Sequence, residues 1–324
     1  MNIIYASDDN YAIPCMVSIL SILRNNNPEE CSIYILSLGL NEKNTALLKK
    51  VQSLYPQSTI SVVELSTEKI KGAIVSDRFP IAIFFRFLIP DLFDFDKALY
   101  LDCDTIVNGN IEELWQVNMD NMACGMVEDQ VSDDITQHNR IRTYTSYYNS
   151  GVMMMNLDYW RKEKLCEQLM KYVIQHPERC LYPDQDAINA TLADKIVPMD
   201  YKFNFQERWY EAQKYWLMHR DKWSQIEKAK KNPVILHYTG PQKPWMAGCT
   251  HPLAKLYFKY KADLIMDGKS IEDDQLRTQQ KQARMADEIA RKKRHKHIRR
   301  ANLFTILFLI ETIAIIAYFF FLGN

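Results

Sequence analysis

The order of secondary-structure patterns at the start of the chain constrains the fold more than any other feature of the sequence. Short apolar runs at residues 2–8, 31–40 and 59–65 predict strands, and amphipathic patterns at residues 11–26 and 41–56 predict helices between them. Strands joined through helices run parallel in one sheet, and the helices cover both of its faces. The sequence therefore predicts an α/β fold with a mostly parallel sheet.

The same alternation continues to residue 265. The chain has 324 residues and is 47% hydrophobic, which is enough to bury the core of one large domain or two small ones. Further strands are predicted at residues 97–102, 123–128, 151–157, 195–199 and 232–238, and further helices at residues 81–93, 158–175, 183–193 and 251–265.

The last part of the chain has a different composition. Residues 269–290 are polar, residues 291–300 hold seven of the 40 Lys and Arg residues, and residues 303–322 are almost entirely apolar. Because about 20 consecutive apolar residues span a bilayer as a helix, the last run predicts a membrane anchor. The expected division is a folded domain at residues 1–268, a polar and then polybasic juxtamembrane helix at residues 269–300, and a transmembrane helix at residues 301–324.

The basic block beside the apolar run favours a cytoplasmic location for the domain before it. Positive flanks stay on the cytoplasmic side and attract anionic lipids, so we expect a single-pass cell-membrane protein. Residues 1–10 lack the features of a signal peptide, and the seven cysteines include no CxxC pair, which fits reduced thiols. A buried core helix is the alternative for residues 303–322 and a nucleic-acid arm for residues 291–300, but their adjacency favours the membrane, with no nucleic-acid partner. Glu311 is the one discordant residue in the span.

Two aspartates follow a predicted strand in the run ALYLDCD. Side chains two residues apart in an extended chain face the same way, so Asp102 and Asp104 can converge on one point. Their hard oxygen ligands suit Mg²⁺ or Mn²⁺. The same spacing recurs at residues 94–96 and 184–186, so spacing alone is weak evidence. The distinguishing feature is the position after a parallel strand, because ligands bind there in open α/β sheets.

Two other predicted strands also end in polar residues. Asp8 and Asn10 follow the first strand and directly precede a helix, where they could bind a base or ribose or simply cap the helix. His237, Gly240 and Lys243 follow a late strand, where the imidazole could be a third metal ligand and the lysine a phosphate partner. Neither GxGxxG nor GxxxxGK[ST] occurs, which excludes the two glycine-rich phosphate-binding loops.

Six motifs in this order resemble glycosyltransferase family 8, which has the GT-A (Rossmann-like) fold and includes bacterial lipopolysaccharide galactosyltransferases and glycogenin. The resemblance covers residues 1–260, and the order and spacing of the motifs make it specific. The motifs are ASDDNY, FFRFLIPDLF, ALYLDCDTIV, YYNSGVMMMNLDYW, YPDQDAIN and HYTGPQKPW.

The resemblance implies a role for twelve residues in binding a UDP-sugar and a divalent cation, Mn²⁺ or alternatively Mg²⁺. Asp102, Asp104 and His237 would hold the metal; Ala6, Asp8 and Asn10 would contact uridine; Gly240, Lys243 and Arg86 would meet the phosphates and donor sugar; and Asn149, Asp184 and Gln185 would line the sugar pocket as the catalytic candidates.

The implied reaction is retaining transfer of glucose or galactose from the UDP-sugar to a saccharide, glycolipid or glycoprotein acceptor at the cytoplasmic membrane face. No carboxylate stands out as a covalent nucleophile, so same-face attack is the favoured hypothesis. Cys103 should point to the opposite strand face from the two aspartates and act in packing. The aromatic residues between positions 203 and 223 could stack on an acceptor sugar, although packing is the commoner use.

Two alternative functions remain open from the sequence. The run YLDCDTIV approximates the DxDx[TV] signature of haloacid-dehalogenase-like phosphatases, but about 100 residues precede it and HYTGPQKPW would have no role. A membrane-tethered UDP-sugar-binding protein without turnover is the non-enzyme alternative.

Overall fold

The computed structural model describes residues 1–71, 80–130, 146–207, 209–210, 222–246, 249–266 and 269–270. The chain divides into a unit of residues 1–271 and a second unit of residues 272–324, and all described residues belong to the first. The predicted basic block and apolar span lie outside the described residues. Within the described ranges, no helix is both long and apolar enough to span a bilayer.

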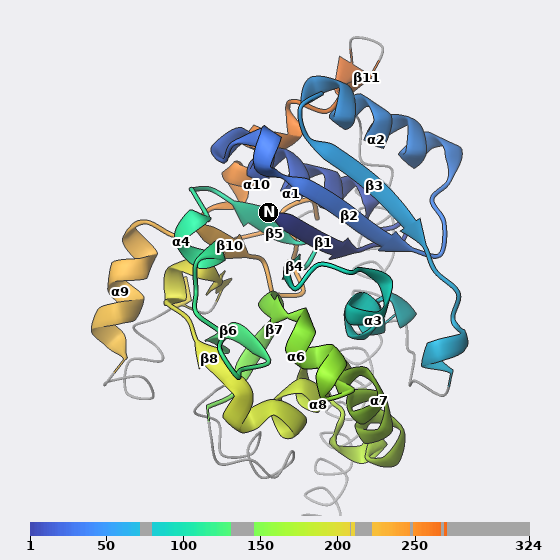
Figure 1. Ribbon diagram of the computed structural model, residues 1–324. Helices are drawn as coiled ribbons and strands as arrows, with labels where there is room; N and C mark the ends of the chain where they lie inside the picture. The colour runs from blue at the N-terminus through green and yellow to red at the C-terminus, as the bar shows by residue number, and fades with distance from the viewer. Residues whose placement is uncertain are drawn as a thin grey trace, which may run out of the picture. The chain divides into compact units, whose positions relative to one another are not determined.

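A seven-stranded sheet forms the centre of the first unit, in the order β3-β2-β1-β4-β7-β6-β8 (Figure 1). Neighbouring strands are parallel except that β7 is antiparallel to both β4 and β6. The predicted mostly parallel sheet is therefore confirmed. Its strands are β1 (Asn2–Ala6), β2 (Ser32–Ser37), β3 (Thr59–Glu64), β4 (Lys97–Leu101), β6 (Cys124–Glu128), β7 (Tyr148–Asn156) and β8 (Ile196–Pro198).

Helices cover both faces of this sheet and bury a separate apolar core on each. The first core includes side chains of α1 (Ala12–Asn25), α2 (Glu42–Leu54) and α10 (Ala254–Lys261), and the second includes those of α3 (Phe85–Leu92), α6 (Leu157–Lys162), α7 (Leu165–Gln175) and α8 (Pro183–Leu192) (Figure 1). Successive residues of β1 alternate between the cores, as a buried strand requires: Ile3 and Tyr5 face the first, and Ile4 faces the second.

The remaining helices in the described residues have three or four residues each, except for α9, which has nine. They are α4 (Glu112–Trp115), α9 (Trp223–Lys231), and the 3-10 turns η1 (Pro28–Glu30), η2 (Glu68–Ile70), η3 (Ile81–Phe84), η4 (Pro177–Arg179), η5 (Ala193–Lys195) and η6 (Tyr201–Phe203).

A small second sheet lies at the carboxyl end of β4. Its strands are β5 (Thr105–Val107), β10 (Ile235–His237) and β9 (Phe205–Gln206), in the order β5-β10-β9. β5 follows the two aspartates directly, and its antiparallel pairing with β10 places His237 opposite Thr105. The sequence predicted neither β5 nor β9, and β9 has only two residues, too few for a readable periodicity.

Three of the predicted helices have a different form in the structure. The helix expected at residues 158–175 is two helices, because Lys164 between them adopts a left-handed conformation with φ of 52°. The helix expected at residues 81–93 begins as the 3-10 turn η3. Lys269–Ser270, predicted to start the polar helix, form strand β12 paired with β11 (Ile265–Met266).

Candidate active site

Asp102 and Asp104 lie directly beyond the carboxyl end of β4. The backbone N–H of Asp102 still donates to the carbonyl of Gly151 in β7, at 2.8 Å, so the ladder holds the first aspartate in place. Thr105 turns the chain back, because its hydroxyl donates to the Asp102 carbonyl at 2.8 Å. The Oδ1 atom of Asp102 accepts from Arg86 and from Tyr100, each at 2.9 Å, which leaves Oδ2 directed at His237.

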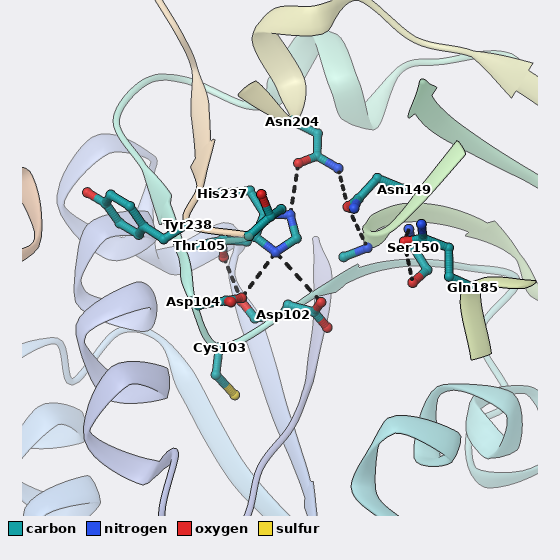
Figure 2. Close-up of polar contacts among 12 residues, drawn as sticks. Asp102, Cys103, Asp104, Thr105, Asn149, Ser150, Gln185, Asn204, His237 and Tyr238 are labelled. Carbon is teal, nitrogen blue, oxygen red and sulfur yellow. Dashed lines mark hydrogen bonds and ion pairs between the residues drawn. The ribbon is translucent and has the colours of Figure 1, made fainter. Parts of the chain in front are cut away.

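His237 closes the third side of this group (Figure 2). Its Nε2 atom lies 3.1 Å from Asp104 Oδ1 and 3.8 Å from Asp102 Oδ2. One ligand atom from each residue can be chosen so that all three lie within 4.8 Å of one another. Two carboxylate oxygens and one imidazole nitrogen form a donor set that suits Mn²⁺ or Mg²⁺, so these residues fit the divalent cation that the sequence implies.

Lys243 lies beside the same group. Its Nζ donates to Asp104 Oδ2 and to the Tyr238 carbonyl, each at 2.6 Å. Burial alone would raise the pKa of Asp104, but the charge of Lys243 and the close contacts with Lys243 and His237 outweigh it and hold the pKa well below its usual range. Asp104 is therefore an anion under ordinary conditions, as a metal ligand must be.

Arg86 connects the aspartate pair to the second candidate region. It is 3% exposed, and its guanidinium lies 2.9 Å from both Asp102 Oδ1 and Asp184 Oδ2. The guanidinium also lies over the ring of Tyr100, 4.4 Å from the centroid. Burial raises the pKa of Asp184, while the Arg86 charge opposes the shift. Removal of Arg86 would leave two carboxylates in the interior without this cation.

An irregularity in β7 places the catalytic candidate Asn149. Met126 of β6 pairs with Met153, yet the next residue, Val127, pairs with Asn149, so the register moves one residue along β6 and four along β7. The intervening residues bulge toward the aspartates. Gly151 in this bulge permits the close approach, because a Cβ there would lie 2.1 Å from His237 Cε1 and 2.6 Å from Asp102 Oδ2.

Asn149, Asp184 and Gln185 are brought together by hydrogen bonds through Ser150 and Asp129. Gln185 Oε1 accepts from the Ser150 N–H at 3.0 Å, and the Ser150 hydroxyl donates to Asp184 Oδ2 at 3.0 Å. Asn149 Nδ2 and Gln185 Nε2 both donate to Asp129 Oδ2, at 2.9 and 3.1 Å. The sequence analysis missed Asp129, which ends the strand ACGMVE and could have been found by the same strand-end rule.

Asn204 is a second residue that the sequence analysis missed. Its side chain is fully buried and lies between His237 Nδ1, at 3.0 Å, and Asn149 Oδ1, at 2.9 Å. It directly precedes β9, whose parallel pairing with β10 brings it to the histidine. The only sequence signal is the polar and apolar alternation of FNFQ, in which both polar residues are buried.

Ala6 is the last residue of β1, the strand beside β4 in the sheet, and Asp8 and Asn10 follow it. Asp8 Oδ1 accepts from the Tyr11 N–H at 3.0 Å in the turn before α1, which starts at Ala12 without a side-chain cap, so a turn contact accounts for one of its oxygens. Asn10 is exposed and donates to Asp8 Oδ2 at 3.4 Å. Burial and then the Asp104 carboxylate raise the pKa of the Tyr11 hydroxyl, so this loop lies close to the aspartates.

Gly240 lies against Glu207 in the loop after β10. A Cβ on Gly240 would lie 1.6 Å from Glu207 Oε2, so a larger residue there would require this carboxylate to move. Trp209, one of the aromatic candidates for acceptor stacking, is 2% exposed and packs edge-on against Tyr201, which favours packing. Trp216 lies outside the described residues.

Cys103 points away from the metal candidates, as predicted (Figure 2). Its thiol donates to the Ala6 carbonyl at 3.2 Å and belongs to the first apolar core. Contact with Cys15 and burial raise the pKa of the Cys103 thiol, so it remains protonated and is no metal ligand.

Comparison with known proteins identifies the family. The sequence profile described as glycosyl transferase family 8 matches residues 2–249. The chain belongs to glycosyl transferase family 8. It is 29% identical over 272 residues to General stress protein A of Bacillus subtilis, with 80% of this chain and 92% of that protein covered. It is also 29% identical over 259 residues to a lipopolysaccharide 1,2-glucosyltransferase of Escherichia coli, with 75% and 73% covered.

Solved structures of the family share the fold. The galactosyltransferase LgtC, in complex with donor and acceptor sugar analogues, superposes with a TM-score of 0.73 at 25% identity, and the match covers 82% of this chain and 97% of LgtC. The GT-A fold is thereby confirmed. The chain is a hexosyltransferase that takes a sugar donor and a saccharide acceptor, and this replaces the phosphatase and binding-protein alternatives.

Proposed function

We propose that this enzyme transfers glucose or galactose from a UDP-sugar to a saccharide acceptor, with a divalent cation, preferably Mn²⁺, held by Asp102, Asp104 and His237. The observation that carries the proposal is the convergence of these three side chains, from β4 and β10, within 4.8 Å of one another. A donor of this kind carries a diphosphate, whose charge requires a metal or basic groups because the chain has no glycine-rich phosphate loop.

Departure of UDP builds negative charge on the leaving phosphate, and the site has two sources of positive charge to meet it. A cation held by Asp102, Asp104 and His237 would supply Lewis-acid stabilisation of that charge. Lys243 is in contact with Asp104 and can donate to the same phosphates, while Gly240 allows the backbone to approach them. Arg86 donates to Asp102 Oδ1 and so orients Oδ2 toward the metal position.

Positive charge that develops on the sugar ring would be met by the polar groups around Asn149, Asp184 and Gln185. Asp184 is ion-paired with Arg86, and Gln185 is an amide whose oxygen already accepts from the Ser150 N–H. Neither is suited to covalent attack. We therefore favour retention by same-face attack, in which the acceptor hydroxyl bonds to the anomeric carbon as the phosphate leaves and takes its proton.

The uridine and the acceptor are assigned to the edges of this centre. Ala6, Asp8 and Asn10 would contact uridine from the loop after β1, where the second oxygen of Asp8 is bonded only weakly, to Asn10 at 3.4 Å. The acceptor would be a saccharide on a lipid or a protein. The sequence of residues 291–322 supports reaction at the cytoplasmic membrane face, with the apolar run as the anchor.

The test is release of UDP from a panel of UDP-sugars by the 324-residue chain, with Mn²⁺, with Mg²⁺ and with EDTA. We expect metal-dependent release from UDP-glucose or UDP-galactose, faster when a saccharide acceptor is present, and no release in EDTA. Equal turnover in EDTA would refute the metal assignment. Turnover of a different nucleotide sugar alone would refute the donor assignment.

A further inference from the structure

We infer that Asn204 is a positioning residue that selects which nitrogen of His237 carries the proton, and so presents Nε2 to the divalent cation. The inference deepens the proposed function, because it concerns the same metal site. It rests on a chain of hydrogen bonds that runs from the backbone of β7 to the imidazole (Figure 2).

The chain begins at Asn149, whose orientation is fixed from both sides. The backbone N–H of Gly151 lies 3.0 Å from Asn149 Oδ1, and a backbone N–H can only donate. On the other side, Asn149 Nδ2 lies 2.9 Å from a carboxylate oxygen of Asp129, which accepts. The two amide ends of Asn149 therefore cannot be exchanged, and its Oδ1 is an acceptor.

The orientation of Asn149 determines that of Asn204. The atom of Asn204 that lies 2.9 Å from Asn149 Oδ1 must be the donor Nδ2, since two oxygens would repel at this distance. Asn204 Oδ1 then faces His237 Nδ1 at 3.0 Å. An amide oxygen accepts only, so Nδ1 must carry the hydrogen.

The proton on Nδ1 leaves the other ring nitrogen for the metal. Nε2 faces Asp104 Oδ1 at 3.1 Å and Asp102 Oδ2 at 3.8 Å, so the nitrogen that can give its lone pair to a cation is the one beside both carboxylates. The opposite tautomer would place two lone pairs 3.0 Å apart at Asn204 and a proton at the metal position.

Burial makes this selection strong. Asn204 is 0% exposed, His237 4% and Asn149 6%, so water cannot replace a broken bond in the chain. Asn204 also joins the metal ligand to Asn149, so a displaced ring would disturb the side chains proposed to line the sugar pocket.

The first arm of the test measures Mn²⁺ affinity by electron paramagnetic resonance, which needs no turnover. Asn204→Ala should weaken binding by about 10- to 100-fold, whereas Asn204→Asp keeps the acceptor for Nδ1 but loses the donor to Asn149 Oδ1, so its affinity should fall between those of Asn204→Ala and the parent chain. Asn156→Asp is the matched control, because Asn156 Nδ2 donates to the carbonyls of Met119 and Met122 and not to this site. Folded Asn204→Ala with unchanged affinity would overturn the inference.

The second arm needs no variant at position 204. Long-range ¹H–¹⁵N spectra of the ¹⁵N-histidine-labelled chain, with and without Mg²⁺, report which nitrogen of His237 is protonated, and His237→Gln assigns the signals. We expect a proton on Nδ1 in both states. A neutral ring protonated at Nε2 would overturn the inference even if UDP-sugar turnover is observed. A correct tautomer without turnover would instead count against the proposed donor chemistry.

Discussion

Two pairs of aspartates with the same spacing flank strand β4, one before it and one after it, and the two pairs differ in their exposure and in their contacts. Asp94 and Asp96 precede β4 and are both exposed, and their carboxylates make no ion pair with any residue in the described ranges. Asp102 and Asp104 follow β4 and contact a guanidinium, an ammonium and an imidazole. The comparison shows that the end of the strand, and not the spacing, makes an aspartate pair a site.

The topology of the sheet explains why, among the described residues, only the pair after β4 has charged partners. Parallel strands that start on one edge of a sheet all end on the opposite edge, so groups that follow different strands gather there. β10 brings His237 to that edge and the bulge in β7 brings Asn149 and Gly151. The amino end of β4 has no such convergence, and Asp94 and Asp96 remain in solvent.

The largest effect is expected from the pair that follows the strand. Asp104→Ala should lower kcat/KM for metal-dependent transfer by about 10³-fold, because it removes a metal ligand and the partner of Lys243. Asp96→Ala, the same change on the exposed pair, should leave kcat/KM within about twofold. Steady-state UDP release measures both. Equal losses in the two variants would contradict the comparison.

The sequence was sufficient for the aspartate pair and, through the family resemblance, for its partners His237, Lys243 and Arg86, but not for the residue that contacts the other side of the histidine ring. The strand end after ALYL is readable because a buried parallel strand is a continuous apolar run. Asn204 is different, because it reaches His237 only through β9, a strand of two residues. Likewise, the bulge in β7 depends on a shift of register that no local pattern encodes.

The long helices and strands were predictable because each carries a pattern that spans several residues. Helices α1 and α2 and strands β1 to β3 carry long amphipathic or apolar patterns, and Asn41, a residue type that favours the N-cap, caps α2 by accepting from the Asn44 N–H. The break between α6 and α7 was not predictable, because it depends on one left-handed residue, Lys164, which is no glycine or asparagine.

Buried and exposed carboxylates should also differ in their effect on stability. Arg86→Met should lower the free energy of unfolding by about 3 kcal/mol, since it strips a cation from the buried Asp184 and the part-exposed Asp102. Arg24→Met is the control, because Arg24 and Asp263 form an exposed pair worth less than about 1 kcal/mol. Urea unfolding measures both. A loss below about 1 kcal/mol for Arg86→Met would contradict this account of the buried cluster.

A methyl group added at Gly151, where the backbone of β7 lies against the metal-binding candidates, should be enough to damage the site. Gly151→Ala would push against His237 and Asp102, with an overpacking cost of about 2 kcal/mol and a Mn²⁺ affinity lower by about tenfold. Gly109→Ala is the matched control, because its nearest neighbour would be Val234 at 3.5 Å, an ordinary contact. Calorimetric titration with Mn²⁺ would show the difference, and unchanged affinity for Gly151→Ala would mean that the bulge can relax.

The last comparison is between two buried histidines, His237 among the metal candidates and His251 in an apolar, aromatic environment. His251 contacts the rings of Tyr210 and Tyr238, and its Nδ1 accepts from the Leu253 N–H at 3.1 Å. Burial lowers the pKa of His251 to about 4 from an ordinary value of 6.5. Because the unfolded chain binds the proton first, this stability is complete above pH 6.5 and is lost progressively as the pH drops toward 4. His251→Gln should flatten this part of the pH profile in thermal unfolding. An unchanged slope would mean that other groups control acid stability, and that a buried histidine without a carboxylate partner has less influence than its position indicates.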